Sequence, residues 1–293
     1  MRDLKLDKLQ LSFAVLNLVA AAITAVLVFA DPREILGGPL WMKPFKFFVS
    51  ATLMSMALAY VIPKIEKAQR LVRIASIVIV GSLTVELVLI TWAAASETTS
   101  HFNVSSPLAI SVWTAMAGFI TAVWVATMIL ALMYLRYGSD KGILKRSMVW
   151  GMGISIIGMG VAFLMTGPTS DQLADFQGIA GAHTVGAADG GPGLPLVGWS
   201  TIAGDLRIPH FFGLHALQAL PLFALALRNR ASKLSVDLFG IGYLIAMALL
   251  TAQALGQQSI VETPFWMMVM LLVAVLAPLI IALAGNNKKK QQA

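Results

Sequence analysis

The feature that most constrains this chain is a series of eight apolar runs, each long enough to cross a membrane. A helix needs about 20 mostly apolar residues to span the hydrocarbon core of a bilayer. The runs are bounded by charged residues, Pro or Gly and cover residues 10–30, 41–62, 73–95, 107–135, 147–166, 209–228, 234–255 and 263–285. The sequence therefore predicts an all-α integral membrane protein, with one transmembrane domain of about eight helices over residues 1–293.

Composition supports the bilayer as the solvent of this chain. Only 12% of the residues are charged and 58% are hydrophobic, whereas about a quarter of a soluble domain is charged. The sequence contains no Cys, which excludes disulfides, thiolate metal sites, Fe–S clusters and cysteine nucleophiles. Gly151-Met152-Gly153 recurs as Gly158-Met159-Gly160 in the fifth run, and small residues at such spacing favour close helix packing in a membrane.

The distribution of Lys and Arg predicts the orientation. With a cytoplasmic N-terminus, 17 of the 21 basic residues fall in cytoplasmic segments, as the positive-inside rule requires. The sequence thus predicts a multi-pass protein of the cell membrane with both termini in the cytoplasm. We interpret the net charge of +7 as contact with anionic lipid headgroups rather than with nucleic acid. The cytoplasmic bases are Arg2, Lys5, Lys8, Lys64, Lys67, Arg70, Arg73, Arg136, Lys141, Lys145, Arg146, Arg228, Arg230, Lys233, Lys288, Lys289 and Lys290.

All four histidines fall on the opposite, outer side in this topology. His101 lies in the outer segment Glu97–Asn103, and a carboxylate and an imidazole at positions i and i+4, as in Glu97 and His101, share one face if the third helix continues outward. The second outer segment, residues 167–208, holds nine glycines together with apolar residues. A loop of that length is usually a functional lid or else disordered, and the apolar residues to be buried argue against disorder. We expect an ordered extracytoplasmic cap that brings His183, Asp189 and Asp205 to the helix ends.

The third outer segment begins the sixth helix. His210 and His215 are five residues apart, about 140° around a straight helix, so they cannot both face one point. Pro221 has no N–H for the carbonyl of Leu217, which predicts a kink beside His215 and Gln218.

Two further polar groups lie within runs. Lys43 and Lys46 are neighbours on one face at the outer end of the second run. Glu86 is near the middle of the third run, where an ionisable group is costly and is by default a functional candidate. We therefore expect a polar funnel that opens outward, with Glu97 and His101 at its mouth. The candidate catalytic residues are Glu97, Glu86, Lys46 and Asp205.

Structural roles remain open for each of these residues. Lys46 is also typical of a side chain that snorkels to the headgroups. Glu86 is also consistent with a neutral acid hydrogen-bonded to Asn17 or Gln253, and His215 with Gln218 is consistent with an interhelical hydrogen bond.

The first functional hypothesis is a metalloenzyme or haem-binding oxidoreductase at the outer face. Haem b needs two axial imidazoles and bases for its propionates. His101, His210 and His215 are the candidate ligands, with Arg207, Lys43 and Lys46 as the bases. A zinc, iron or manganese ion would instead use a His/carboxylate set. Such an enzyme could be an oxidoreductase or a hydrolase of a small molecule or lipid. The candidate metal ligands are His101, His183, His210, His215, Glu97, Asp189 and Asp205.

Two alternatives come from other classes. An ion- or proton-coupled transporter or channel would use Glu86 and Lys46 to line its pathway, and a membrane sensor or assembly factor would use the cap as its binding surface. The chain has neither a phosphate-binding glycine loop, hence no expected nucleotide cofactor, nor a G-x-S-x-G nucleophile elbow. Neither the oligomeric state nor the partner follows from the sequence.

Several segments carry a resemblance to a bacterial family of multi-pass membrane proteins that has no assigned function. The resemblance covers most of the chain and implies no activity. The arrangement of eight spans with outer histidines is also similar to haem A synthase at the level of topology, although the Glu-x-x-His-Arg pattern of that family is absent and no ligand transfers from it. The segments are Trp41–Phe47, Ser100–Asn103, Gly191–Pro195, Gly198–Ser200 and Gly204–Gln218.

Overall fold

The computed structural model describes residues 5–227 and 230–290, with side chains as far as Ala284 in the last helix. The charges of Arg2, Asp3 and Arg228, and the side chains of Lys288, Lys289 and Lys290, all used to predict orientation, lie outside the described part. The described chain is 72% helical, as the apolar runs predict.

Long helices form the body of the molecule. They are α1 (Lys8–Ala30), α2 (Met42–Val61), α3 (Gln69–Ala95), α4 (Pro107–Tyr137), α5 (Gly142–Val161), α7 (Arg207–Leu214), α8 (Ala216–Leu227), α9 (Lys233–Leu255) and α10 (Phe265–Lys290). The 3₁₀ turns η1 (Ile62–Lys64) and η2 (Ala162–Met165) extend α2 and α5. Among the described residues seven helices are long and apolar enough to cross a membrane, and there are eight if α7 and α8, bent by 46°, count as one span. The predicted bundle of about eight candidate spans is confirmed to that extent.

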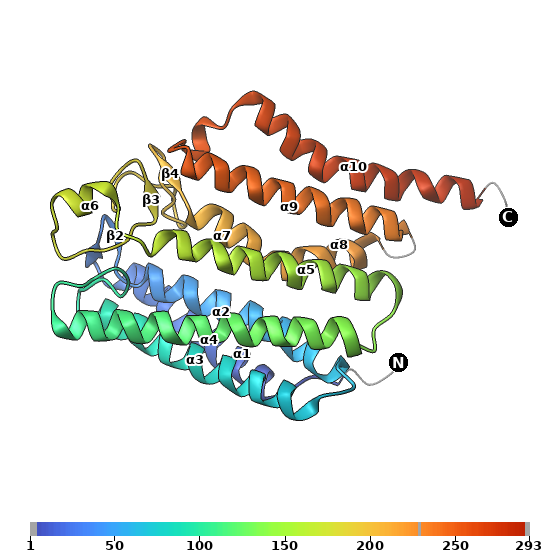
Figure 1. Ribbon diagram of the computed structural model, residues 1–293, viewed down its shortest axis with the longest axis horizontal. Helices are drawn as coiled ribbons and strands as arrows, with labels where there is room; N and C mark the ends of the chain where they lie inside the picture. Colours follow the sequence, from blue (N-terminus) through green and yellow to red (C-terminus); the bar gives the residue numbers. More distant parts are fainter. Residues whose placement is uncertain (1–4, 228–229, 291–293) are drawn as a thin grey trace.

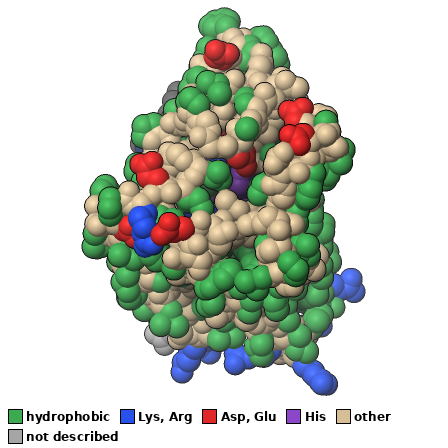
Figure 2. All heavy atoms as spheres, turned by 90° about the vertical axis from the view of Figure 1, so that its left-hand side faces the viewer, with side chains coloured by type: hydrophobic (Ala, Val, Ile, Leu, Met, Phe, Trp, Pro, Cys, Tyr) green, Lys and Arg blue, Asp and Glu red, His purple; other side chains and the backbone are tan. Residues whose placement is uncertain are grey.

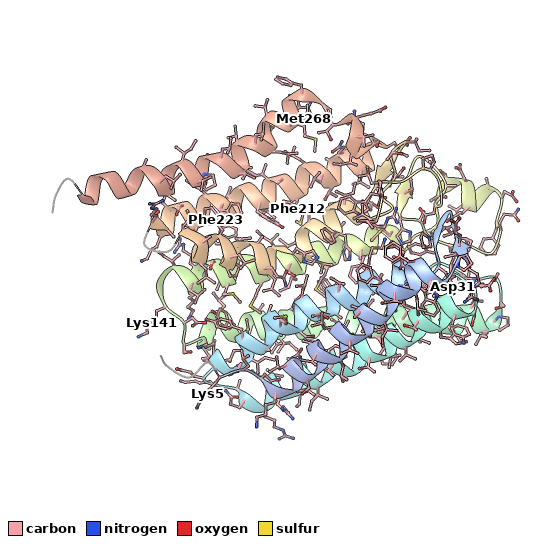
Figure 3. The ribbon with its side chains drawn as sticks, turned by 180° about the vertical axis from the view of Figure 1, so that it is seen from behind. Lys5, Asp31, Lys141, Phe212, Phe223 and Met268 are labelled. Atoms are coloured by element: carbon pink, nitrogen blue, oxygen red, sulfur yellow. The ribbon has the colours of Figure 1, made fainter. Side chains whose placement is uncertain are left out.

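The helices run side by side along the long axis of the molecule (Figure 1). α1 packs on α2 and α3 on α4, while α5 packs on α7, α8 and α9, and α10 lies outside against α9. α1 begins and α10 ends at one end of the bundle, which we call the basic end. Lys5 and Lys141 lie at this end, and Asp31 lies at the other (Figure 3). We call that other end the cap end.

Short elements assemble the cap end. They are β1 (Glu34–Ile35), β2 (Gly38–Pro39), α6 (Ser170–Ala174), β3 (Thr184–Val185), β4 (Gly204–Asp205) and η4 (Ile260–Glu262). β1 pairs with β2, and β3 pairs antiparallel with β4, with Thr184 opposite Asp205. Phe102 and Leu206 are buried there with Met165 of η2 and Ala254 of α9. This apolar contact holds the loops against the helix ends.

Local signals explain where the helices begin. Asp7 accepts a hydrogen bond from the backbone N–H of Gln10 and so caps α1. Ser106 caps α4 ahead of Pro107 at the first helical position, and the Ser232 side chain caps α9. Each cap satisfies an N–H group that the first turn of a helix leaves free.

Two glycines of α5 allow α7 and α8 to approach its backbone. A Cβ built on Gly158 would lie 2.5 Å from the Cα of Gly213, and one on Gly151 would lie 2.8 Å from the carbonyl oxygen of Ala216. No larger residue fits at either position without a shift of backbone. The predicted role of the glycine repeat in close packing is confirmed at these two positions, whereas Gly153 faces open space.

The sixth span breaks at His215 rather than at Pro221. α7 ends at Leu214, and the His215 carbonyl accepts from the N–H groups of Gln218 and Ala219 at the start of α8. Pro221 lies inside α8. The prediction of a bend beside His215 and Gln218 is correct, but the break precedes the proline by six residues. The close approach of Gly213 to α5 constrains the chain just ahead of that break.

Candidate functional site

Polar side chains from α2, α7 and two cap loops meet beneath the cap. We call this set the cap site. In the space-filling view of the cap end, a histidine lies recessed between cap segments, with an acidic side chain beside it (Figure 2). Lys43 is within electrostatic range of Lys46, Arg207 and Asp189, and His210 is within that range of His183 and His215. The residues of the cap site are Lys43, Lys46, His101, His183, Asp189, His210 and His215.

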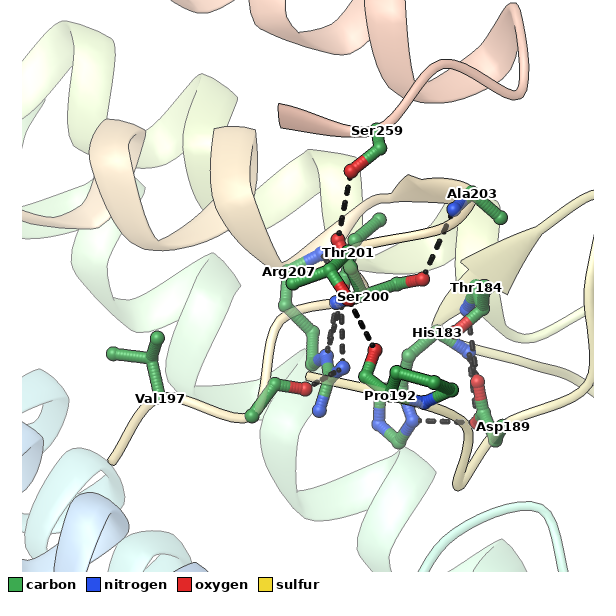
Figure 4. A network of polar contacts seen from close by, with 12 residues as sticks. His183, Thr184, Asp189, Pro192, Val197, Ser200, Thr201, Ala203, Arg207 and Ser259 are labelled. Carbon is green, nitrogen blue, oxygen red and sulfur yellow. Dashed lines mark hydrogen bonds and ion pairs between the residues drawn. The ribbon is translucent and has the colours of Figure 1, made fainter. Parts of the chain in front are cut away.

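His183 and Asp189 form a hydrogen-bonded pair (Figure 4). The Nδ1 atom of His183 lies 2.7 Å from a carboxylate oxygen of Asp189. The same carboxylate accepts from the backbone N–H groups of His183, at 3.1 Å, and Thr184, at 2.9 Å. The turn between them passes through Gly186 with φ +92°, a value that glycine adopts without strain. β3 begins directly after His183, and its pairing with β4 joins the His183–Asp189 pair to the segment that leads into α7.

The surroundings fix the charges of this pair. Burial alone would raise the pKa of Asp189, but the bonds from His183 and Thr184 outweigh it and hold that pKa well below its usual range. Burial lowers the pKa of His183, against the opposing effect of Asp189. Near neutral pH the pair is therefore an ionised carboxylate and a neutral imidazole whose Nδ1 carries the proton. Its Nε2 atom is then a base with a free lone pair.

His210 is held by a carbonyl that α5 releases. The N–H of Ala162, which in an α-helix would bond to Gly158, bonds instead to Met159 and Gly160 as η2 begins. The freed carbonyl of Gly158 accepts from Nδ1 of His210 at 2.8 Å. A carbonyl oxygen only accepts, so Nδ1 of His210 carries a proton and Nε2 of the neutral ring has a lone pair.

His215 is oriented in the same sense by an amide. Its Nδ1 atom lies 3.2 Å from Oε1 of Gln218, and Nε2 of Gln218 donates to the Leu53 carbonyl of α2 at 3.1 Å. The Leu53 carbonyl fixes which end of the amide faces His215, so Nδ1 of His215 is again the donor. The bond from Gln218 to Leu53 joins two helices, which is the structural role that the sequence left open for this pair.

His101 has the opposite arrangement. Its Nδ1 atom lies 2.9 Å from the Ser100 hydroxyl and 3.2 Å from Nζ of Lys43. An ammonium group only donates, so Nδ1 of His101 accepts and its Nε2 carries the proton. Burial, with the charges of Lys43 and His183, holds the pKa of His101 well below its usual range. His101 is thus a neutral donor, whereas the other three imidazoles present acceptors.

The Nε2 atoms of the four imidazoles are not used by the part of the chain that the structure describes. Within the described part of the chain none makes a hydrogen bond, and none is among the buried side-chain atoms without a partner. Phe102 lies between two of the rings, with centroids 6.0 Å from His101 and 4.9 Å from His183. Trp113 packs on His101 at 5.4 Å. Aromatic rings therefore flank His101 and His183, two of the four imidazoles with an unused Nε2.

Asp205 and Arg207 pair with each other at the edge of the cap site. The Asp205 carboxylate is fully buried and lies 2.6 Å from Nη2 of Arg207. It also accepts from the backbone N–H groups of Ser200 and Arg207, both at 2.9 Å. The guanidinium donates further to the Gly198 carbonyl at 2.6 Å. These contacts close the loop that precedes α7, so the residues predicted as catalytic and as a propionate base hold the cap together.

The helical pairing that the sequence predicts for Glu97 and His101 does not form. α3 ends at Ala95, and Glu97 has a left-handed backbone with φ +54°. The helix therefore does not carry the i and i+4 pair outward. The Glu97 carboxylate bonds Arg33 at 2.8 Å, and its side chain is 61% exposed. The predicted i and i+4 pairing is therefore wrong, while a funnel with Glu97 at its mouth stays a prediction.

Glu86 is buried in α3 and is only 4% exposed. Its Oε1 atom has no hydrogen-bond partner among the described residues. The expected partners bond elsewhere, because Asn17 donates to the Phe13 carbonyl and Gln253 to Ser259 and Thr263. Lys43 is within electrostatic range of Glu86. A pathway through Glu86 and Lys46 stays a prediction.

The predicted metal ligands do not assemble as a set. In the described residues, no three His, Asp or Glu side chains form a group that could hold a metal ion. The imidazoles occupy separate anchors, and Asp189 is taken by His183. Binding of a metal ion or of haem b stays a prediction. A cavity of about 480 Å³ lies at the basic end, beside Lys67, Arg136 and Tyr137.

Several contacts that shape the site leave no mark in the sequence. His183 and Asp189 were both candidates, but as metal ligands rather than as a pair, because six residues of loop do not reveal a turn. The glycines at 186 and 190 were the available signal.

Comparisons of the chain with protein-family models, with curated proteins and with solved structures gave no match.

Proposed function

We propose that the cap site is the active site of a membrane-embedded hydrolase or transferase in which His183 acts as general base. The observation that carries the proposal is the Asp189 carboxylate, which holds Nδ1 of His183 at 2.7 Å while Nε2 is unpaired. A carboxylate that fixes the tautomer of an imidazole in this way is the device of the Ser-His-Asp enzymes. Among the described residues no serine hydroxyl bonds to the His183 ring, so the attacking group is water or a substrate hydroxyl.

The step uses only the side chains of the cap site and a water molecule. Nε2 of His183 takes a proton from water, and the oxygen bonds to an acyl or phosphoryl centre of the substrate. The bond to the leaving oxygen breaks, and the imidazolium returns the proton to that oxygen. Asp189 stays ionised and stabilises the imidazolium in between. Nε2–H of His101 and the ammonium groups of Lys43 and Lys46 supply donors toward charge that develops on the substrate.

The test uses the full-length protein in detergent. Its probes are p-nitrophenyl dodecyl phosphate, an anionic diester, and p-nitrophenyl dodecanoate, a neutral ester. We expect release of p-nitrophenolate from at least one probe, and we expect His183→Gln to abolish it. Asp175→Asn is the matched control, because Asp175 is an exposed cap carboxylate that bonds Gln177. Release that His183→Gln leaves unchanged, or no release from either probe, would overturn the proposal.

A second candidate function is the haem- or metal-dependent oxidoreductase. It is favoured by three imidazoles, His183, His210 and His215, that are each held through Nδ1 and offer an Nε2 lone pair. Ligand histidines are commonly oriented in this way. Two of them would suffice as axial ligands to haem b. A Soret band or stoichiometric metal in the purified protein, lost in His210→Gln, is the expected result; their absence rejects this candidate.

We also propose that the basic end faces the cytoplasm and that the cap end faces outward. The segregation of basic side chains away from the cap supports this orientation. Cysteines introduced at Ser139 and at Asp175 test it, because the chain has no other cysteine. An impermeant maleimide added to intact cells should label only the cysteine at 175, and the reverse labelling would refute the orientation.

A further inference from the structure

Lys43 and Lys46 have more hydrogen-bond donors than the protein uses. Nζ of Lys46 donates to the Val197 carbonyl at 2.8 Å, and Nζ of Lys43 contacts Nδ1 of His101 at 3.2 Å. Each ammonium group has three donors, and no other contact of either group is found among the described residues. Neither lysine forms an ion pair with a carboxylate in that part of the chain. Two cations with spare donors thus lie side by side on one face of α2.

The nearby carboxylates already have partners. Asp205 is paired with Arg207, and Asp189 is paired with His183. Glu86 has one unpaired oxygen, and the structure gives it no bond to either lysine. Arg207 adds a third cation within electrostatic range of both. A half-buried cluster of positive charge with unused donors is stabilised when an anion accepts from it.

The neighbouring surface is apolar. Phe47, next to Lys46 in sequence, is 37% exposed, and Leu196, next to Val197, is 70% exposed. Phe211, whose ring packs on His215 at 4.3 Å, is 48% exposed. Exposed apolar side chains beside a cluster of cations match a ligand with a charged head and a hydrocarbon tail.

We propose that Lys43 and Lys46 form an oxyanion-binding subsite that holds the acidic head, phosphate or carboxylate, of an amphiphilic substrate. This inference rests on the proposed function, because it assigns the substrate class of the same site. The two ammonium groups and Nε2–H of His101 donate to the head. The tail lies along Phe47, Leu196 and Phe211, which leaves the reactive bond of the substrate facing Nε2 of His183.

Equilibrium binding to the full-length protein tests the subsite without any turnover. The probes are dodecyl phosphate, dodecanol and inorganic phosphate. We expect one dodecyl phosphate per chain, and about a tenfold or larger rise in Kd in Lys46→Gln, since a hydrogen bond to a charged group is lost. Lys46→Arg keeps the charge and restores most of the binding. Lys145→Gln is the matched control, because Nζ of Lys145 likewise donates to a carbonyl, that of Gly138 at 2.9 Å, at the basic end.

The remaining arms separate the outcomes. Weaker but lysine-dependent binding of inorganic phosphate means that the head alone is recognised, whereas binding of dodecyl phosphate only means that the tail is required. Equal binding by the Lys46→Gln and Lys145→Gln variants, or equal binding of dodecanol, which has the tail without the acidic head, overturns the subsite. If Lys46→Gln does not fold, Lys43→Gln takes its place. Binding is measured here without turnover, whereas the general base is tested by release of p-nitrophenolate, so failure of the general base and failure of the subsite remain distinguishable.

Discussion

Replacing Asp189 by Asn removes the negative charge beside Nδ1 of His183. It tests whether that charge keeps Nε2 of His183 a base. The remaining oxygen of the side chain can still accept from the backbone N–H of Thr184, which donates to it at 2.9 Å in the unmodified protein. The new amide N–H₂ would face Nδ1 of His183, where a carboxylate oxygen lies at 2.7 Å. Two donors cannot bond, so the His183 ring exchanges its proton to Nε2. The base at the open side of the ring is then lost.

The size of the effect follows from those contacts. The lost charge-assisted hydrogen bond is worth about 1.5–3 kcal/mol, and loss of general-base catalysis lowers kcat by about 10²–10⁴-fold. We therefore expect a lower melting temperature together with near-complete loss of p-nitrophenolate release. In the unmodified protein burial keeps the pKa of His183 below its usual value of about 6.5. Activity should accordingly be flat from neutral to mildly alkaline pH and should fall as the pH drops below that pKa, because protonation removes the base.

The assay compares Asp189→Asn with Asp175→Asn over that pH range, with melting temperatures measured in the same detergent. A folded Asp189→Asn protein with at least half of the original kcat and an unchanged acidic limb would refute the reasoning.

Three further predictions concern the scaffold. Gly158→Val places a side chain against the backbone of Gly213, so it should cost about 1–3 kcal/mol of stability, seen as a lower melting temperature; an unchanged value contradicts the close packing. Asp205→Asn leaves Arg207 without its buried carboxylate. Because Arg207 is 29% exposed, we expect the free energy of unfolding to fall by the low end of about 3–5 kcal/mol, while the melting temperature of Asp175→Asn stays unchanged. The folded protein holds His101 neutral, while the unfolded chain protonates it near pH 6.5. Stability should therefore fall as the pH drops below about 6.5, and His101→Gln should flatten this dependence of stability on pH. Equal slopes in the variant and the unmodified protein reject the prediction.

The sequence predicted what depends on hydropathy and local chemistry. Runs of apolar residues located the spans to within a few residues, because length and apolar character are local properties. The glycine spacing of α5 predicted close packing at Gly151 and Gly158 for the same reason. Lys43 and Lys46 were expected on one helix face, and the structure has both near the cap end of α2.

Contacts that depend on single backbone torsions or on distant segments could not be predicted. One left-handed residue, Glu97, ends the helix that was expected to carry a carboxylate to His101. Lys43 reaches His101 across 58 residues of chain. The carbonyl that holds His210 is free only because α5 tightens into a 3₁₀ turn at Ala162, a change too small to leave a mark in the pattern of apolar residues.

The tautomers of the four histidines test the central claim most directly. With ¹⁵N-labelled histidine, the full-length protein gives signals from only four imidazoles, and single His→Gln variants assign them. At neutral to mildly alkaline pH we expect the proton on Nδ1 in His183, His210 and His215 and on Nε2 in His101. A spectrum in which His183 carries its proton on Nε2, or is doubly protonated at that pH, would contradict the account of the cap site as one built around a free base.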